Sequence, residues 1–218
     1  MTNKITSQNL KIKKTQKNFV YNFVKKYYSQ NQFELLYNQL QQNFNCQETS
    51  STARILDAVS LLLEFCQNKR NYKHEPIDLL EKNSSVPYKI NPKIFYDKKE
   101  KKYILLTTPL FEYLIKNLPL TFFPPGKKVR GLHRDKKRLA ATAQFYIAQG
   151  LYRIIFKSQF SIFKKEKKDL PIFFGGGIAN NKIISNYLES KGVYVNKKIP
   201  RGDAGISFGQ IMYYLYAK

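Results

Sequence analysis

The last third of the chain restricts the fold most, because short apolar runs alternate there with an amphipathic stretch. The apolar run PIFF ends in three consecutive glycines, Gly175 to Gly177, and an amphipathic stretch over 180–190 follows. Gly192 then precedes a second apolar run, VYV, over 193–195. Strands that alternate with helices pair in parallel, and glycine suits the turns between them. We therefore expect an α/β fold.

A second glycine-rich turn, PRGDAG, follows the second apolar run and leads into an apolar stretch over 206–217 that predicts a final helix. Farther upstream, apolar residues recur three and four positions apart. They predict a helical extension over 1–45, a helix with an apolar face from Ile55 to Cys66 after caps at Thr49, Ser50 and Ser51, a short helix over 72–81, a hairpin over 93–106, a helix over 108–117, a Pro-rich loop over 118–131, and a long helix over 135–160. In the long helix, the expected buried stripe runs from Ala140 to Ile155, and lysines at 164–168 end the helix.

The charge balance is strongly basic, with 38 Lys and Arg against 15 Asp and Glu and a formal net charge of +23. Such a charge suits a polyanionic partner. However, 31 of the basic residues are Lys and only seven are Arg, and Asn, Ile, Tyr and Phe are also abundant, as adenine- and thymine-rich coding would produce. Recognition of phosphates with geometric specificity tends to use Arg. Non-selective contact with nucleic acid and a solvated lysine surface both remain open, and we favour the second.

Few patterns in the chain indicate chemistry. No apolar run reaches the length of a membrane span and no apolar leader follows the basic start, so we expect no membrane contact and a cytoplasmic protein. Cys46 and Cys66 are expected to be free thiols, and His74 and His133 to lie at the surface. The two glycine-rich turns are the better candidates: Gly175 to Gly177 could admit an anion to backbone N–H groups, and Asp203 puts a carboxylate in the other turn. Tight packing and helix capping are the alternatives, which local sequence favours.

Three blocks, in order, resemble a known family. TSSTARILDAVSLLLEF resembles T-S-S-x-G-R-L-F-D-A-V-A-x-L-L-G, FFGGGIANNKII resembles L-S-G-G-V-F-Q-N-R-L-L, and IPRGDAGISFGQ resembles V-P-x-N-D-G-G-I-S-L-G-Q. These are patterns of the HypF family, the carbamoyltransferases of nickel-iron hydrogenase maturation. The last block is the most specific, since most of its positions from Pro200 to Gln210 fall in register. The resemblance spans roughly 46–218, which predicts a HypF-like lobe there and the helical extension over 1–45.

The resemblance implies a single lobe of the actin, hexokinase and sugar-kinase (ASKHA) fold, an α/β fold that cradles an adenine nucleotide, ATP or carbamoyl-adenylate. It implies that Asp57 contacts the ribose, and that the glycine turn of Gly175, Gly176 and Gly177, together with Asn181, approaches the adenosine and phosphates. It further implies that Asp203 ligates a divalent metal, shared with a partner lobe. No catalytic residue is assigned.

Departures from the family pattern qualify this interpretation. Ala53, Gly175 and Gly202 replace a Gly, a Ser and an Asn of the pattern, and Tyr146 stands where the pattern has His. Residues 1–45 are too few for the family's other lobe and contain no His. We therefore expect a partial or split carbamoyltransferase that acts with a partner chain supplying the missing lobe, transfers a carbamoyl group to a thiol of a HypE-like acceptor, and associates through exposed apolar surface.

Two other hypotheses remain open. The chain could be a subunit of an enzyme that makes threonylcarbamoyladenosine in tRNA, for which the charge of +23 would be useful. It could also be a non-catalytic remnant with a role in assembly.

Overall fold

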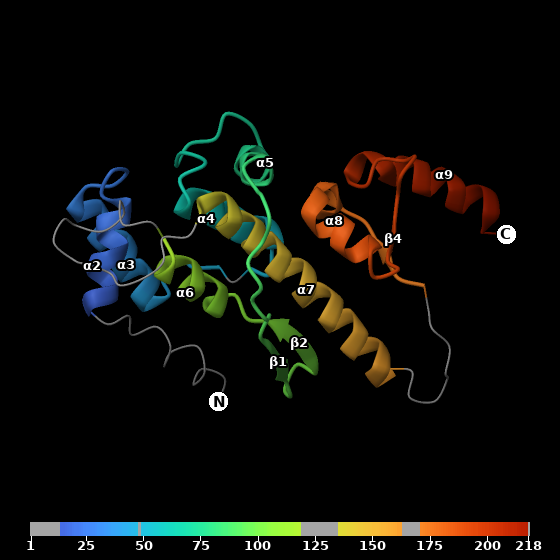
Figure 1. Cartoon of the computed structure of the whole chain (residues 1–218), viewed down its shortest axis with the longest axis horizontal. Helices are drawn as coiled ribbons and strands as arrows, with labels where there is room; N and C mark the ends of the chain where they lie inside the picture. Colours follow the sequence, from blue (N-terminus) through green and yellow to red (C-terminus); the bar gives the residue numbers. More distant parts are fainter. Residues whose placement is uncertain (1–13, 48, 119–134, 163–170, 218) are drawn as a thin grey trace. The chain divides into compact units, whose positions relative to one another are not determined.

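The computed structural model describes residues 14–47, 49–118, 135–162 and 171–217 (Figure 1). Its contacts divide the chain into two units, residues 1–50 and 51–218. The predicted loop over 118–131, apart from its first residue, lies outside the described residues, as do His133 and the lysines at 164–168.

The first unit contains two helices, α2 (Lys14–Val24) and α3 (Gln30–Gln42). They are separate because Ser29 caps α3: its hydroxyl accepts the Gln32 N–H, and the Gln32 side chain accepts the Ser29 N–H. This reciprocal pair is a capping box, which starts a new helix. Phe33 is the buried residue of α3, and its ring lies 5.1 Å from that of Tyr21 in α2.

The second unit begins with α4 (Thr52–Leu62), α5 (Glu75–Lys82), the strands β1 (Ile94–Asp97) and β2 (Lys102–Leu105), and α6 (Thr108–Lys116). The two strands form the predicted hairpin, antiparallel with Ile94 opposite Leu105. The expected extent of α4 is wrong at its end. Glu64 takes a left-handed backbone with φ 59°, which ends the helix, so Cys66 lies beyond it rather than on its apolar face.

Helix α7 (Lys136–Ile162) forms the centre of the second unit and contacts α4, α8 and β2. Of its residues up to 158, whose burial the structure describes, the buried ones lie between Leu139 and Gly150, where alanines let the neighbouring helices approach closely. The predicted buried stripe is wrong beyond that point, because Leu151, Ile154 and Ile155 are only half-buried. In this part of the helix, long side chains contact the hairpin: the Lys157 ammonium lies 5.7 Å from the Tyr103 ring.

The predicted strand and helix alternation is confirmed in the last third. Strand β3 (Phe173–Phe174) pairs in parallel with β4 (Tyr194–Val195), and α8 (Lys182–Glu189) connects them. Short 3₁₀ turns, η2 (Gly177–Asn180) and η3 (Asp203–Gly205), precede α8 and the last helix, α9 (Ile206–Tyr216). The second unit is therefore a mixed helix and strand structure whose sheets are small. Among the described helices, none combines the length and the apolar character needed to cross a membrane.

Candidate functional site

A cavity of about 460 Å³ lies where the start of α4, helix α5 and the η2 turn meet. Its lining combines hydroxyls, side-chain amides, two carboxylates and backbone next to glycine, contributed by Ser51, Thr52, Ala53, His74, Ile77, Asp78, Glu81, Gly177, Ile178, Asn180 and Asn181. The first two of the three family-like blocks, more than 100 residues apart, therefore converge on one cavity. Ala53, which replaces a Gly of the family pattern, is part of its wall, and His74 is exposed, as predicted.

Glu81 joins two walls of this cavity. Its carboxylate on α5 accepts the backbone N–H of Lys182, the first residue of α8, at 3.2 Å. Burial raises the pKa of the Glu81 carboxyl, and this effect outweighs the opposing influence of the Lys182 N–H. Sequence reasoning did not single out Glu81 or Asp78 as lining residues, because their position depends on contacts between segments far apart in the chain.

The two glycine-rich turns, which sequence reasoning treated separately, are adjacent. Gly176 has φ 90°, a backbone that favours glycine, and its N–H donates to the Arg201 carbonyl at 2.6 Å. A Cβ on Gly202 would lie 3.7 Å from the Gly177 Cα. Gly175 to Gly177 are exposed, but Gly177 is the one that lines the cavity. Their contact with phosphates stays a prediction, and the N–H of Gly176 already has an acceptor.

Arg201, which the sequence did not indicate, holds this pair of turns together. Its guanidinium donates to the carbonyls of Asn196 at 2.8 Å and Ala179 at 3.0 Å, and lies 3.8 Å from the Glu189 carboxylate. The planar, five-donor guanidinium can satisfy several carbonyls at once. The only available signal was an arginine inside a glycine-rich turn of a chain that mostly uses lysine.

Asn181 is buried and both ends of its amide are engaged. Its oxygen accepts the Ile184 N–H at 3.0 Å and so caps α8, while its Nδ2 donates to Gln144 Oε1 at 2.7 Å. Gln144, buried in α7, in turn donates to the Ser84 hydroxyl at 2.7 Å. Asn181 therefore shapes the cavity wall through its own hydrogen bonds, and Gln144 is a supporting residue that sequence reasoning missed.

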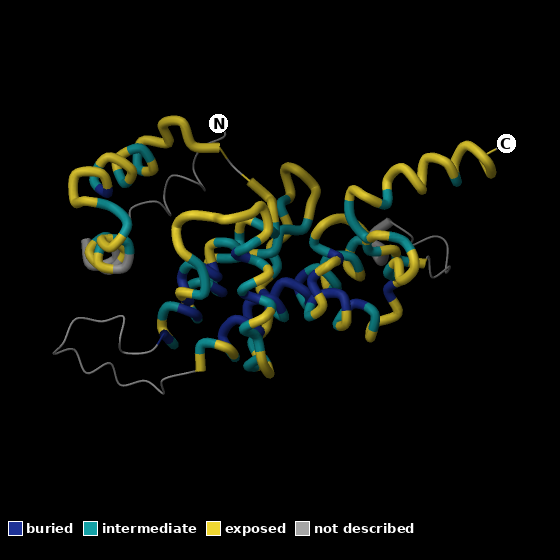
Figure 2. Tube along the Cα trace, turned by 90° about the horizontal axis from the view of Figure 1, so that it is seen from above, coloured by how far each residue is buried: buried dark blue, intermediate teal, exposed yellow. Residues whose placement is uncertain are grey.

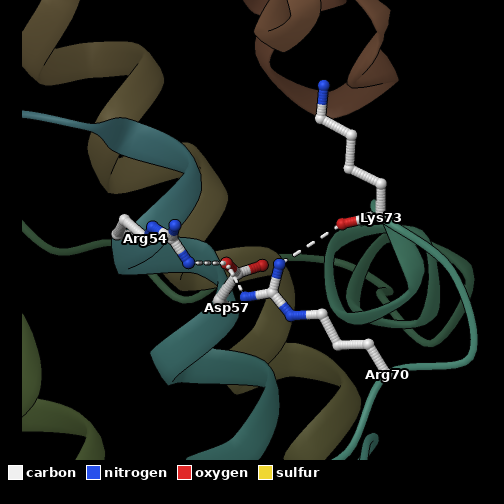
Figure 3. Close-up of polar contacts among 4 residues, drawn as sticks. All are labelled: Arg54, Asp57, Arg70 and Lys73. Carbon is white, nitrogen blue, oxygen red and sulfur yellow. Dashed lines mark hydrogen bonds and ion pairs between the residues drawn. The ribbon is translucent and has the colours of Figure 1, made fainter.

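Asp57 lies on α4 and is engaged by arginines (Figure 3). Its Oδ2 accepts from Arg70 at 2.6 Å, and Arg54, three residues earlier on the helix, lies 4.0 Å away. Arg70 also donates to the Lys73 carbonyl at 3.3 Å, which fixes the loop before α5. Asp57 Oδ1 is buried and has no hydrogen-bond partner among the described residues. Asp57 is absent from the cavity lining, so its contact with a ribose also stays a prediction.

Asp203 is exposed in η3, at the start of α9. The N-cap residues of η3 and α9 are Gly202 and Gly205, so Asp203 is not itself the cap, but it places a carboxylate in the first turn of η3. Within the described part of the chain, no three His, Cys, Asp or Glu side chains gather as a metal site would require. Asp203 would thus contribute a single ligand, and the described residues do not by themselves fit a metal centre.

Comparison with known proteins gives a consistent result. The family model described as "Carbamoyltransferase, Kae1-like Domain, second subdomain" matches residues 3–210. The probable carbamoyltransferase HypF of Methanocaldococcus jannaschii is 34% identical, over 89% of this chain and 24% of its own length. Among solved structures, T. kodakarensis HypF matches with a TM-score of 0.62 and 21% identity, over 89% of this chain and 24% of that one. Full-length HypF in the phosphate- and nucleotide-bound form matches with a TM-score of 0.64 and 20% identity, over 88% and 28%.

The chain therefore spans about a quarter of the length of the relatives it matches. The family match covers nearly all of the chain, including most of the segment over 1–45 that the sequence motifs left outside the resemblance. The chain belongs to the HypF-type carbamoyltransferase family, as the second subdomain of its Kae1-like domain.

Proposed function

We propose that the cavity between α4, α5 and η2 binds an adenine nucleotide or carbamoyl-adenylate, and that the chain serves as the nucleotide-binding lobe of a HypF-type carbamoyltransferase with an ASKHA fold. The remaining parts would come from elsewhere in the same polypeptide or from a partner chain. The observation that carries the proposal is the meeting of two distant family blocks around one cavity. One matched structure is of full-length HypF in a phosphate- and nucleotide-bound form, which supports the proposal by analogy.

The cavity suits such a ligand in size and in chemistry. Its volume of about 460 Å³ lies within the roughly 300–1,000 Å³ of small-molecule sites. Asp78 and Glu81 present oxygens that can accept hydrogen bonds from ribose hydroxyls or an adenine amino group. The same carboxylates repel phosphates, so the phosphates would lie toward Gly177, where a side chain is absent.

When bound, carbamoyl-adenylate supplies an activated carbamoyl group for transfer to a thiol of a HypE-like acceptor, in the cytoplasm. The residues of this chain would hold and orient the adenylate. The hydrogen bonds from Arg201 and Asn181 hold the η2 wall, and the bond from the Lys182 N–H to Glu81 links that wall to α5, so the cavity needs little rearrangement on binding. If a divalent metal takes part, Asp203 would give it one oxygen ligand and other ligands must come from outside the described residues.

Calorimetric titration of the full chain with ATP or AMP tests the proposal. Gly177→Val should weaken binding at least about tenfold, because the added side chain enters the cavity. The fold should stay intact, because a Cβ at this position meets no atom within 4 Å. Asp57→Asn tests the ribose contact separately. Gly209→Val is the matched control, because Gly209 is also free of neighbours within 4 Å and lies outside the cavity.

If Gly177→Val binds like Gly209→Val, the ligand is not in this cavity. If the parent chain binds no adenine nucleotide at all, the non-catalytic assembly role becomes the better hypothesis.

A further inference from the structure

The last helix, α9, is apolar and uncovered. Apart from the half-buried Met212, each of its residues is exposed, and no residue of the helix is buried (Figure 2). Its exposed large side chains are Ile206, Phe208, Ile211, Tyr213, Tyr214, Leu215 and Tyr216. It carries no charged residue between Ile206 and Tyr216. Exposed apolar surface of this size marks an interaction site.

One side of α9 has the spacing of a docking face. Phe208, Ile211, Met212 and Leu215 stand three, one and three residues apart, which places them along a single stripe. Three of these side chains are largely exposed: Phe208 is 44% exposed, Ile211 58% and Leu215 57%. Such a stripe fits an apolar groove that accepts one face of a helix.

We infer that this stripe docks into an apolar groove on the part of a HypF-type enzyme that this chain does not match. This inference rests on the proposed assembly with other subdomains. The family model names this region a second subdomain, and the matched relatives are about four times as long, so most of their chain remains available to cover α9.

Charge argues against the two other occupants. A second copy would bring together two chains with a formal charge of +23 each, which repel one another. A helix that lies on a membrane surface usually carries Lys or Arg on its polar side, whereas α9 has Ser207, Gln210 and tyrosines there.

The test mixes the full chain with M. jannaschii HypF from which the matched quarter has been deleted, after circular dichroism has shown that this probe is folded. Sedimentation velocity should show a complex. Ile211→Glu combined with Leu215→Glu should weaken it at least about tenfold. Val86→Glu is the matched control, because Val86 is 71% exposed and lies outside α9. Full-length M. jannaschii HypF should form no complex, because its own subdomain already fills the groove.

A second measurement keeps the inference testable if the deleted probe does not fold. The second measurement uses a chimera in which this chain replaces the matched quarter of M. jannaschii HypF. Amide hydrogen exchange in α9 should be slower in the chimera than in the isolated chain. The double Glu substitution in the chimera should restore the faster exchange. Equal binding by parent and double variant, no protection of α9 in the chimera, or association of the chain with itself through α9 would each overturn the inference. Ile211 and Leu215 lie outside the nucleotide cavity. The nucleotide titration therefore tests the proposed function independently of this docking inference.

Discussion

Among single residues, Arg201 and Gly205 explain how the two glycine-rich turns are held next to each other in a fixed backbone conformation. The Arg201 carbonyl receives the Gly176 N–H while its side chain satisfies the carbonyls of Asn196 and Ala179. A Cβ on Gly205 would lie 2.2 Å from the Pro200 carbonyl oxygen, so only glycine fits there without a backbone shift. Close backbone approach therefore requires glycine at 205, and the positive φ favours it at Gly176, whatever ligand the cavity takes.

Glu81 makes the stability of the second unit depend on pH. Burial raises the pKa of its carboxyl, so the folded chain binds this proton more tightly than the unfolded chain, where the pKa is about 4.3. The sign follows: the contribution of Glu81 to stability is most favourable below about pH 4.3 and declines as pH rises through the folded-state pKa. Glu81→Gln keeps an oxygen for the Lys182 N–H but does not ionise. We expect it to be more stable than the parent at pH 7, with the difference shrinking toward pH 4.

Denaturant unfolding of both proteins between pH 4 and pH 8 measures this difference. Glu112→Gln, an exposed carboxyl on α6, shows how much the loss of one negative charge matters in so basic a chain. A Glu81→Gln variant that is less stable than the parent at pH 7 would show that the ionised carboxylate is favoured in the fold.

Between elements, the hydrogen bonds of Gln144 connect α7 to the cavity wall. Replacement by Leu removes the acceptor of the Asn181 Nδ2 and the donor to the Ser84 hydroxyl, which keeps its own bond to the Leu80 carbonyl. We expect Gln144→Leu to lower the free energy of unfolding by about 1–3 kcal/mol, the usual cost of a buried polar group left unpaired. Urea unfolding, followed by circular dichroism, measures the loss.

Gln149 on the same helix is the matched control. Its Oε1 is buried and, within the described part of the chain, has no hydrogen-bond partner, so Gln149→Leu removes an unsatisfied group. The stability of this variant should stay within about 0.5 kcal/mol of the parent or exceed it. Equal losses for the two variants would mean that Gln144 contributes through packing and not through its hydrogen bonds.

The order and type of the elements were predictable because their apolar spacing and turn residues are local. The predicted hairpin, the long helix and the parallel strand pair are confirmed. The extent of burial was not predictable in the same way. Apolar spacing in α7 shows which side of the helix is buried, but it does not show how far along the helix the neighbouring elements cover that side.

The candidate site was predictable only as separate blocks. The bonds that hold the second block in place connect residues 37 and 101 positions apart, Gln144 to Asn181 and Glu81 to Lys182, and no local pattern reveals such pairs.

For the whole molecule, the formal charge of +23 gives an expectation about nucleic acid. Lysine supplies most of that charge, and lysines bind phosphates as point charges without reading shape. Affinity for tRNA should then come from released counterions and fall steeply with salt. We expect filter binding to tRNA and to an unrelated duplex of equal length to be similar at about 0.05 M salt, and nearly lost for both at about 0.15 M, where the Debye length is about 8 Å.

The same measurement separates the two carbamoyl-transfer pathways. A subunit of a tRNA threonylcarbamoyladenosine enzyme must distinguish folded tRNA from a duplex through its shape and its single-stranded loops, and such contacts survive higher salt. A marked preference for tRNA that persists at about 0.15 M salt would therefore favour the tRNA pathway over transfer to a HypE-like thiol. Equal and salt-sensitive binding would leave the lysine excess as a property of the solvated surface, which agrees with the scarcity of Arg in this chain.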